Sequence, residues 1–157
     1  MNDCIVIGPV LGAADMVDVR RLFEEYQSWL NVDLCFQDFR QELATLPGKY
    51  APPNGSLLLA REGDKVAGIV CLRPLSEGVC EMKRLFVRPP WLGKGIGRAL
   101  ATAIINEGRK AGYGIMKLDT LERLVAAESL YKSLGFARTG AYCVNPEDDV
   151  IYMSLDL

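Results

Sequence analysis

The 157-residue sequence contains no histidine. A chain without histidine has no Ser-His-Asp or Cys-His nucleophile pair, no His-ligated zinc site and no imidazole proton shuttle. If the protein is an enzyme, its acid and its base must be a carboxylate, a tyrosine, a cysteine, a lysine or a water molecule. The absence therefore narrows the possible catalytic groups before any motif is considered.

The chain also has little net charge and no long apolar run. Its 18 Lys and Arg residues nearly balance 20 Asp and Glu residues, so the net charge is only −2. This charge provides no field that would attract nucleic acid or anionic lipid. No apolar stretch reaches the length of a membrane span, and the first residues lack the basic segment of a signal peptide. We therefore expect a cytoplasmic protein with no nucleic-acid partner and no membrane partner.

Cysteine is present but not in a structural pattern. The five cysteines are odd in number, and no two of them form a C-x-x-C pair. This usage predicts reduced thiols in an intracellular protein rather than a disulfide framework or a zinc ribbon. With histidine also missing, we expect no metal site.

The length and the 50% apolar content predict a single domain spanning residues 1–157. Apolar spacing predicts helices at 15–30, with Asp15 as N-cap, and at 36–46, 96–111 and 126–134. Strands are predicted at 4–7, 56–61, 66–72, 79–87, 115–120, 136 onward and 150–155. An antiparallel first half followed by a βαβ-like second half predicts the α+β class.

A glycine-rich loop lies between the strand at 79–87 and the helix that follows it. The loop reads Gly93-Lys94-Gly95-Ile96-Gly97-Arg98. Small residues let backbone N–H groups approach phosphate oxygens, and the N-terminus of the following helix favours negative charge. The segment therefore predicts an anion site.

Two common phosphate loops fit this segment poorly. A Walker A loop needs Lys-Ser or Lys-Thr after its last glycine, and the Rossmann fingerprint needs glycine where Arg98 stands. Asp119, at the end of the next strand, does imitate the Rossmann ribose-binding acid. A nucleotide-binding domain therefore stays as a third hypothesis that rests on the loop and Asp119.

The loop and its flanks resemble a different family. The run Arg84-Leu85-Phe86-Val87-Arg88-Pro89, followed by the run from Gly93 to Leu100, resembles the acetyl-CoA signature of the GNAT superfamily of N-acetyltransferases. The segment from Ala127 to Phe136 is similar to that superfamily's second signature. The resemblance implies the GNAT fold, an α/β sandwich whose mixed, mostly antiparallel sheet is flanked by helices. It also implies that the parallel strands at 79–87 and 115–120 splay apart.

The resemblance implies that an acetyl group moves from acetyl-CoA to a primary amine by direct attack in a ternary complex. It places acetyl-CoA, as co-substrate, on one set of residues. These are Leu85, Phe86, Val87, Leu92, Gly93, Lys94, Gly95, Ile96, Gly97, Arg98 and Ala127. In this superfamily the strand that corresponds to 79–87 has a bulge, which leaves backbone groups free to pair with the pantetheine amides and to polarise the thioester carbonyl.

Two residues carry the expected proton transfers. Tyr131 matches the superfamily's usual general acid, and a phenol with a pKa near 10 stays protonated at pH 7. Glu81 is the candidate general base, acting directly or through water. The alternative for Glu81 is an exposed strand carboxylate paired with Lys83 or Arg84, and the sequence leaves that choice open.

Two positions depart from the superfamily pattern. Leu92 stands where Arg or Gln is usual, and Leu124 stands where many members have an Asn that contacts the pantetheine. We expect weakened rather than abolished cofactor binding. These departures motivate the alternative function, a catalytically idle acyl-CoA-binding regulatory module on the same fold.

The sequence says less about the acceptor end, which is the part of the site that would bind the amine. Phe36 and Tyr142 are the candidate substrate residues, although the helical spacing of Phe36 with Phe39 and Leu43 favours a core role. Tyr142 is an amphipathic ring next to a loop, which suits a pocket. The acceptor is expected to be a small-molecule or protein amine. The acyl chain and the oligomeric state, a homodimer included, stay open.

Overall fold

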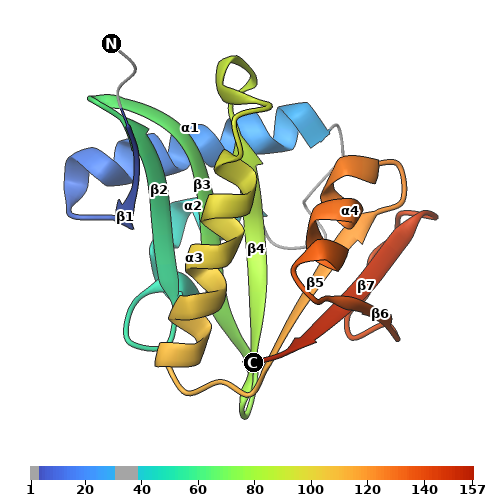
Figure 1. Cartoon of the computed structure of the whole chain (residues 1–157). Helices are drawn as coiled ribbons and strands as arrows, with labels where there is room; N and C mark the ends of the chain where they lie inside the picture. Colours follow the sequence, from blue (N-terminus) through green and yellow to red (C-terminus); the bar gives the residue numbers. More distant parts are fainter. Residues whose placement is uncertain (1–3, 31–38) are drawn as a thin grey trace.

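One mixed sheet organises the computed structural model, which describes residues 4–30 and 39–157. Within these residues seven strands pair in the order β1-β2-β3-β4-β5-β7-β6 (Figure 1). The strands are β1 (Ile5–Pro9), β2 (Ser56–Glu62), β3 (Lys65–Ser76), β4 (Val79–Val87), β5 (Ile115–Leu121), β6 (Ala137–Thr139) and β7 (Val150–Asp156). The α-helices are α1 (Ala13–Leu30), α2 (Phe39–Thr45), α3 (Ile96–Lys110) and α4 (Val125–Ser133).

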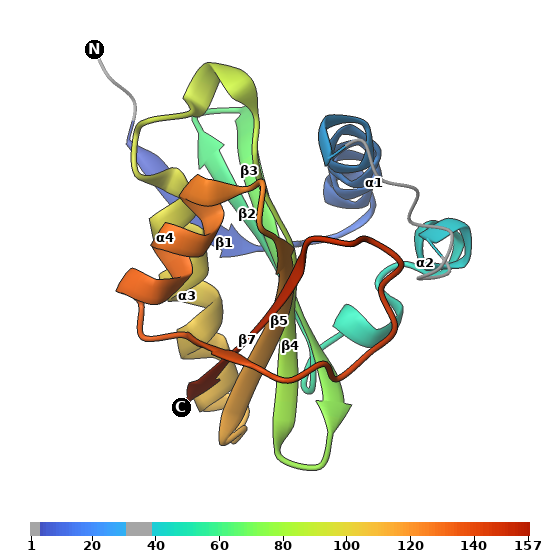
Figure 2. The same ribbon diagram turned by 90° about the vertical axis from the view of Figure 1, so that its right-hand side faces the viewer.

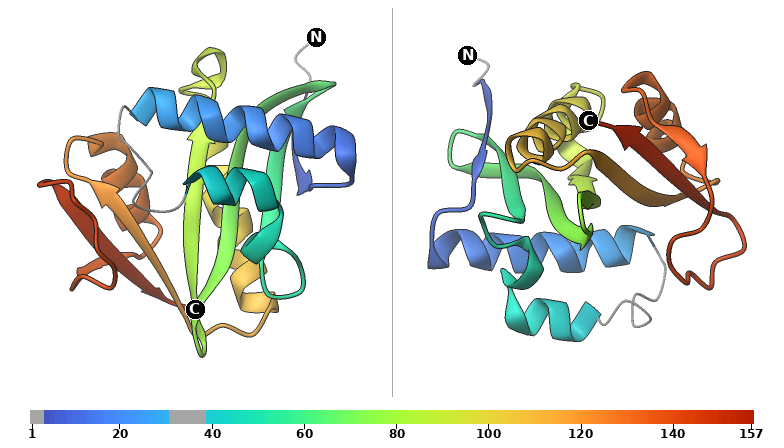
Figure 3. Two further views of the ribbon diagram at one scale, coloured as in Figure 1. Left: turned by 180° about the vertical axis from the view of Figure 1, so that it is seen from behind. Right: turned by 90° about the horizontal axis from the view of Figure 1, so that it is seen from below.

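Helices cover both faces of the sheet. Helices α1 and α2 lie on one face, and α3 and α4 lie on the other (Figures 2 and 3). Strand β2 has a continuously apolar sequence because both of its faces are buried. Leu57 and Leu59 pack in the cluster beneath α1 and α2, whereas Leu58 and Ala60 pack in the cluster beneath α3. Because alternate side chains enter opposite cores, every residue of this run must be apolar.

The sheet divides between β4 and β5. These two strands form its parallel pair, and their register is Val79 with Ile115, Cys80 with Met116, and Glu81 with Lys117. Beyond Glu81 the strands diverge into a V (Figure 1). The expected fold class, with parallel strands that splay within 79–87 and 115–120, is therefore confirmed.

The beginning of α1 differs from the expectation. Asp15 lies in the first turn of the helix, and it is not the N-cap that the sequence predicts. Its carboxylate reaches back to accept a hydrogen bond from the backbone N–H of Leu11 at 2.7 Å, and it also pairs with Arg61. This bond fixes the chain that enters the helix, as the backward bond of a capping box does, but it leaves the first N–H groups of the helix itself without a side-chain cap from Asp15.

The helix ends agree with the sequence. Gly112 follows α3 with a φ of +91°, and Gly135 follows α4 with a φ of +103°. Glycine adopts this left-handed conformation without the steric cost of a Cβ, so these residues end the two helices close to the predicted bounds. In the described ranges, none of the helices combines the length and apolarity needed to cross a membrane.

Candidate active site

A cleft of about 270 Å³ opens where β4 and β5 diverge. Its walls come from the second half of β4, the end of β5, α4, the end of α1 and the glycine loop. Most of the expected cofactor residues line it, together with Tyr131. They are Leu85, Phe86, Val87, Leu92, Gly93, Gly95, Ile96, Gly97 and Ala127. Lys94 and Arg98 are not part of the lining, and the Arg98 guanidinium donates instead to Ser133 Oγ at 2.8 Å.

Strand β4 carries a bulge at the mouth of the V. Phe86 pairs with Ile69 and Lys83 pairs with Cys71, so two β4 residues, Arg84 and Leu85, lie opposite one β3 residue. Arg84 has a φ of +58°, a conformation that costs a non-glycine residue about 1–3 kcal/mol. The strand bulge that the family resemblance implies is therefore present in this chain.

The glycine loop ends at the N-terminus of α3. Gly93 and Gly95 both have a φ of +79°, and an added Cβ at either position would meet no atom within 4 Å. Gly95 caps α3 without a side-chain hydrogen bond, so the first N–H groups of the helix have no partner within it. Gly97, in the first turn of α3, also lines the cleft. The loop is an open concave surface of backbone donors suited to an anion.

Tyr131 lies on α4, where its side chain both joins the core and lines the cleft. Its ring packs edge-to-face against Phe136, with centroids 5.8 Å apart. Burial raises the pKa of the Tyr131 phenol above its usual value. The side chain is therefore held as a neutral donor at physiological pH, as a general acid requires.

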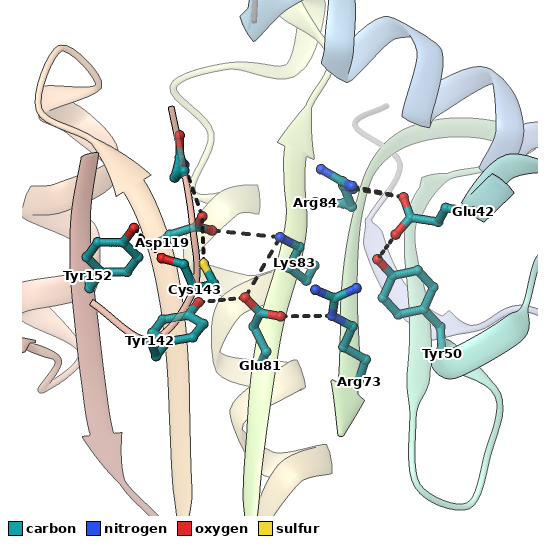
Figure 4. Close-up of polar contacts among 11 residues, drawn as sticks. Glu42, Tyr50, Arg73, Glu81, Lys83, Arg84, Asp119, Tyr142, Cys143 and Tyr152 are labelled. Atoms are coloured by element: carbon teal, nitrogen blue, oxygen red, sulfur yellow. Dashed lines mark hydrogen bonds and ion pairs between the residues drawn. The ribbon is translucent and has the colours of Figure 1, made fainter. Parts of the chain in front are cut away.

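Glu81 is buried, so the exposure assumed by the open alternative is wrong, whereas the pairing with Lys83 that it named is present. Its side chain is 1% exposed, because β4 is a central strand. Arg73 Nε donates to Glu81 Oε1 at 2.8 Å, and the Tyr142 hydroxyl donates to Oε2 at 2.5 Å. Lys83 Nζ is 3.8 Å from Oε2. The two candidate residues Glu81 and Tyr142 are therefore joined by a hydrogen bond (Figure 4).

Lys83 and Asp119 extend this network, and the sequence did not assign either of them to the acceptor end. Lys83 Nζ lies 3.8 Å from Asp119 Oδ1, and Asn145 Nδ2 donates to Asp119 Oδ2 at 3.2 Å. Burial lowers the pKa of Lys83, while the neighbouring carboxylates oppose that change. Lys83 and Asp119 both line the cleft. The sequence does contain one indication that Lys83 belongs with Glu81: the two residues are two positions apart, so they lie on the same face of β4.

A second buried ion pair lies on the other side of β4 (Figure 4). Arg84 Nη2 and Nε donate to Glu42 Oε2 at 2.9 and 3.2 Å, and the Tyr50 hydroxyl donates to Glu42 Oε1 at 2.5 Å. The guanidinium also lies over the rings of Phe23, Tyr26 and Phe39 at 5.4–5.9 Å. No local pattern in the sequence indicates this pairing.

The two expected substrate residues have different outcomes. Tyr142 does not line the cleft; its ring packs against Tyr152 at 5.3 Å, and Lys117 Nζ lies 5.7 Å from its centroid. Burial, reinforced by Glu81, raises the pKa of the Tyr142 phenol. Phe36 lies outside the described residues. Phe39, predicted to be core, is buried.

A splayed sheet with a glycine-rich anion loop and a buried phenol at one cleft defines the class of N-acetyltransferases. Residues 16–136 match the model of the acetyltransferase (GNAT) family. The chain belongs to this family. An uncharacterised N-acetyltransferase of Schizosaccharomyces pombe is 43% identical over 155 residues, which are 98% of this chain and 95% of that protein.

Solved structures support the same fold. A GNAT-family acetyltransferase from Staphylococcus aureus aligns with a TM-score of 0.79 at 18% identity, covering 98% of this chain and 99% of that one. The PaiA N-acetyltransferase of Thermoplasma acidophilum, solved in complex with coenzyme A, aligns with a TM-score of 0.77 at 17% identity. That alignment also covers 98% of this chain and 99% of the other.

Proposed function

We propose that this chain transfers an acetyl group from acetyl-CoA directly to a primary amine of a small molecule or protein in a ternary complex. The observation that carries the proposal is that the glycine loop, the diverging edge of β4 and Tyr131 line one cleft. The coenzyme A bound by the PaiA relative supports acetyl-CoA as the co-substrate.

The cofactor end works chiefly through backbone groups. The N–H groups from Gly93 to Arg98 hold the pyrophosphate, and the dipole of α3 adds to its binding. On the diverging edge of β4, Leu85, Phe86 and Val87 hold one side of the pantetheine. Ala127 and Leu92 contact its other side. A backbone N–H after the bulge polarises the thioester carbonyl, which stabilises the oxyanion that forms during attack.

The Tyr131 phenol and the Glu81 carboxylate move the protons. As the amine nitrogen bonds to the acyl carbon, its proton passes through a water molecule to Glu81, whose Oε2 also accepts the Tyr142 hydroxyl at 2.5 Å. The C–S bond breaks, and Tyr131 gives its proton to the departing thiolate. Glu81 therefore acts as the base without itself lining the cleft.

Asp119 is the rival base, because it is a carboxylate that does line the cleft. Glu81→Gln and Asp119→Asn separate the two roles. If Glu81 is the base, Glu81→Gln abolishes the acidic limb of the kcat/KM profile and Asp119→Asn retains it. The reverse result assigns the base to Asp119.

Calorimetric titration and an amine screen test the function as a whole. We expect coenzyme A and acetyl-CoA to bind, and at least one primary amine to drive release of free thiol from acetyl-CoA. No binding at millimolar ligand would rule the proposal out. Binding without turnover on any amine would favour the idle acyl-CoA-binding module, which the exposed Leu92 at the loop motivates.

A further inference from the structure

The β4 bulge is built on an unusual residue. Among residues 4–30 and 39–157, Arg84 is the one non-glycine residue with a positive φ. Its side chain is only 2% exposed. A residue other than glycine keeps this conformation only where its surroundings hold it, and such positions cluster at active sites.

The surroundings that hold Arg84 come from segments far away in the chain. On α2, Glu42 Oε2 accepts hydrogen bonds from Arg84 Nε and Nη2, and Glu42 Oε1 accepts one from the Tyr50 hydroxyl. Tyr50 is itself buried and packs edge-to-face on Phe23 at 6.0 Å. Glu42 is therefore fixed from two sides, and Arg84 is fixed by Glu42.

The bulge lies directly before the part of β4 that faces the cleft. Leu85 and Phe86, the residues after Arg84, both line the cleft. A change in the backbone at Arg84 turns their N–H groups, because the direction of a bulge is set by the dihedral angles of its first residue. The anion loop at 93–98 lies on a separate segment and does not depend on that direction.

We propose that Glu42 is a positioning residue for acetyl transfer, acting through Arg84 to hold the bulge so that the following N–H groups meet the thioester. The inference rests on the proposed function. It assigns a role in the reaction to α2, although Glu42 itself does not line the cleft.

The variant Glu42→Gln tests the proposal, since it keeps the size of the side chain and removes its charge. We expect kcat to fall about tenfold, because misaligned groups in a preorganised site lose at least this much. The KM for acetyl-CoA should change less than about twofold, because the pyrophosphate cradle is untouched. An unchanged kcat would overturn the proposal, as would equal losses in kcat and in cofactor affinity.

Glu25→Gln is the matched control. Glu25, on α1, binds Arg88 through two hydrogen bonds of 3.0 and 2.8 Å, so it is also a helix carboxylate that holds an arginine next to β4. Arg88 follows the bulge by four residues and has an ordinary φ of −61°. We expect Glu25→Gln to leave kcat within about twofold. If both variants lose kcat equally, the bulge has no special role and the proposal fails.

Two further measurements keep the result interpretable. If Glu42→Gln does not fold, Tyr50→Phe removes one bond to Glu42 and retains the ion pair; we expect a smaller loss in kcat at unchanged KM, and no loss overturns the proposal. Amide NMR shifts of Leu85 and Phe86 should differ between bound acetyl-CoA and bound coenzyme A in the wild type, but not in Glu42→Gln. This signal is independent of turnover, so wild-type shifts without turnover would count against the proposed function, whereas turnover with identical shifts in both proteins would count against the role of Glu42.

Discussion

The two ends of the cleft differ in the chemical groups that form them. The end proposed for the cofactor is lined by glycines and apolar side chains from one stretch of β4, the glycine loop and α4. The end proposed for the acceptor has the charged side chains Lys83 and Asp119 in the cleft lining and Glu81 beside Lys83 outside it, and these residues come from β4 and β5 (Figure 4). The first end is encoded locally, whereas the second exists only after the sheet has formed.

This difference has opposite consequences for substitution. A backbone surface tolerates the loss of a side chain but not the addition of one, because an added Cβ occupies the space of the ligand. A buried ion-pair network tolerates additions at its edge but not the loss of a member, because the remaining charges are left uncompensated. Each of the following predictions tests one side of this contrast.

The largest effect is expected at Tyr131, where the cofactor end depends on one side-chain atom. Tyr131→Phe should lower kcat by about 10²- to 10⁴-fold, the usual contribution of a general acid, and leave coenzyme A binding unchanged. Because burial raises the pKa of the phenol, Tyr131 should stay protonated up to about pH 10, and wild-type kcat should not fall through loss of this acid below that pH. Steady-state kinetics and calorimetry check both results; a variant that keeps kcat would remove Tyr131 from the mechanism.

The next effect concerns the stability of the acceptor end. Glu81→Ala leaves Arg73 without its carboxylate partner and removes one of the two carboxylates beside the buried Lys83, so the free energy of unfolding should fall by about 3–5 kcal/mol. Urea denaturation measures the change. Glu128→Ala is the control, because Glu128 makes a two-bond pair with Arg138 at the surface, and its loss should have little effect. Equal losses in the two variants would contradict the contrast between the ends.

Adding a methyl group at Gly97 should affect binding and not folding. An added Cβ there would make only ordinary contacts, 3.8 Å from Leu130 and 3.9 Å from Val87, and alanine favours the helix over glycine by up to about 1 kcal/mol. We expect Gly97→Ala to keep or raise the melting temperature while coenzyme A affinity falls about tenfold, a loss of about 1.4 kcal/mol.

Gly140→Ala is the control for the same addition. A Cβ at Gly140 would meet nothing within 4 Å, and this residue lies outside the cleft lining. Its coenzyme A affinity should match the wild type. If Gly97→Ala also binds normally, the first turn of α3 does not contact the cofactor.

The smallest effect is expected from a cation added at the cofactor end. Leu92 is 58% exposed at the start of the glycine loop, where the family usually has Arg or Gln. Leu92→Arg should strengthen coenzyme A binding by up to about fivefold, the range of an exposed ion pair, and the gain should shrink in high salt. A gain that persists at 1 M salt would point to packing rather than charge.

The sequence predicted the fold, and it also named most of the residues that line the glycine-loop end of the cleft, because both depend on local patterns. Strand 79–87 has the expected bounds, and the apolar spacing and glycine ends located α3 and α4 within a residue or so. Tyr131, Gly93, Gly95 and Gly97, which the family resemblance named, all line the cleft; their roles stay predictions.

The acceptor end could not be predicted in the same way. The Tyr142–Glu81 bond joins residues 61 positions apart, and the Arg84–Glu42 bond joins residues 42 apart. Such pairs depend on sheet order and on loop paths, which periodicity does not encode. The exposed alternative for Glu81 failed for a related reason, since alternation along a strand does not tell how deeply that strand lies within the sheet.

The place where β4 and β5 separate has a consequence for how such a cleft changes during evolution. Strand pairing advances in whole residues of about 3.3 Å each, so the depth of the V can change only in steps of that length. In this chain the last step is the pair of Glu81 with Lys117, and Glu81 is also bound to Arg73 and Tyr142. A mutation that deepens the V by one step therefore displaces the carboxylate that we propose as the base, so depth and acceptor chemistry are expected to evolve together.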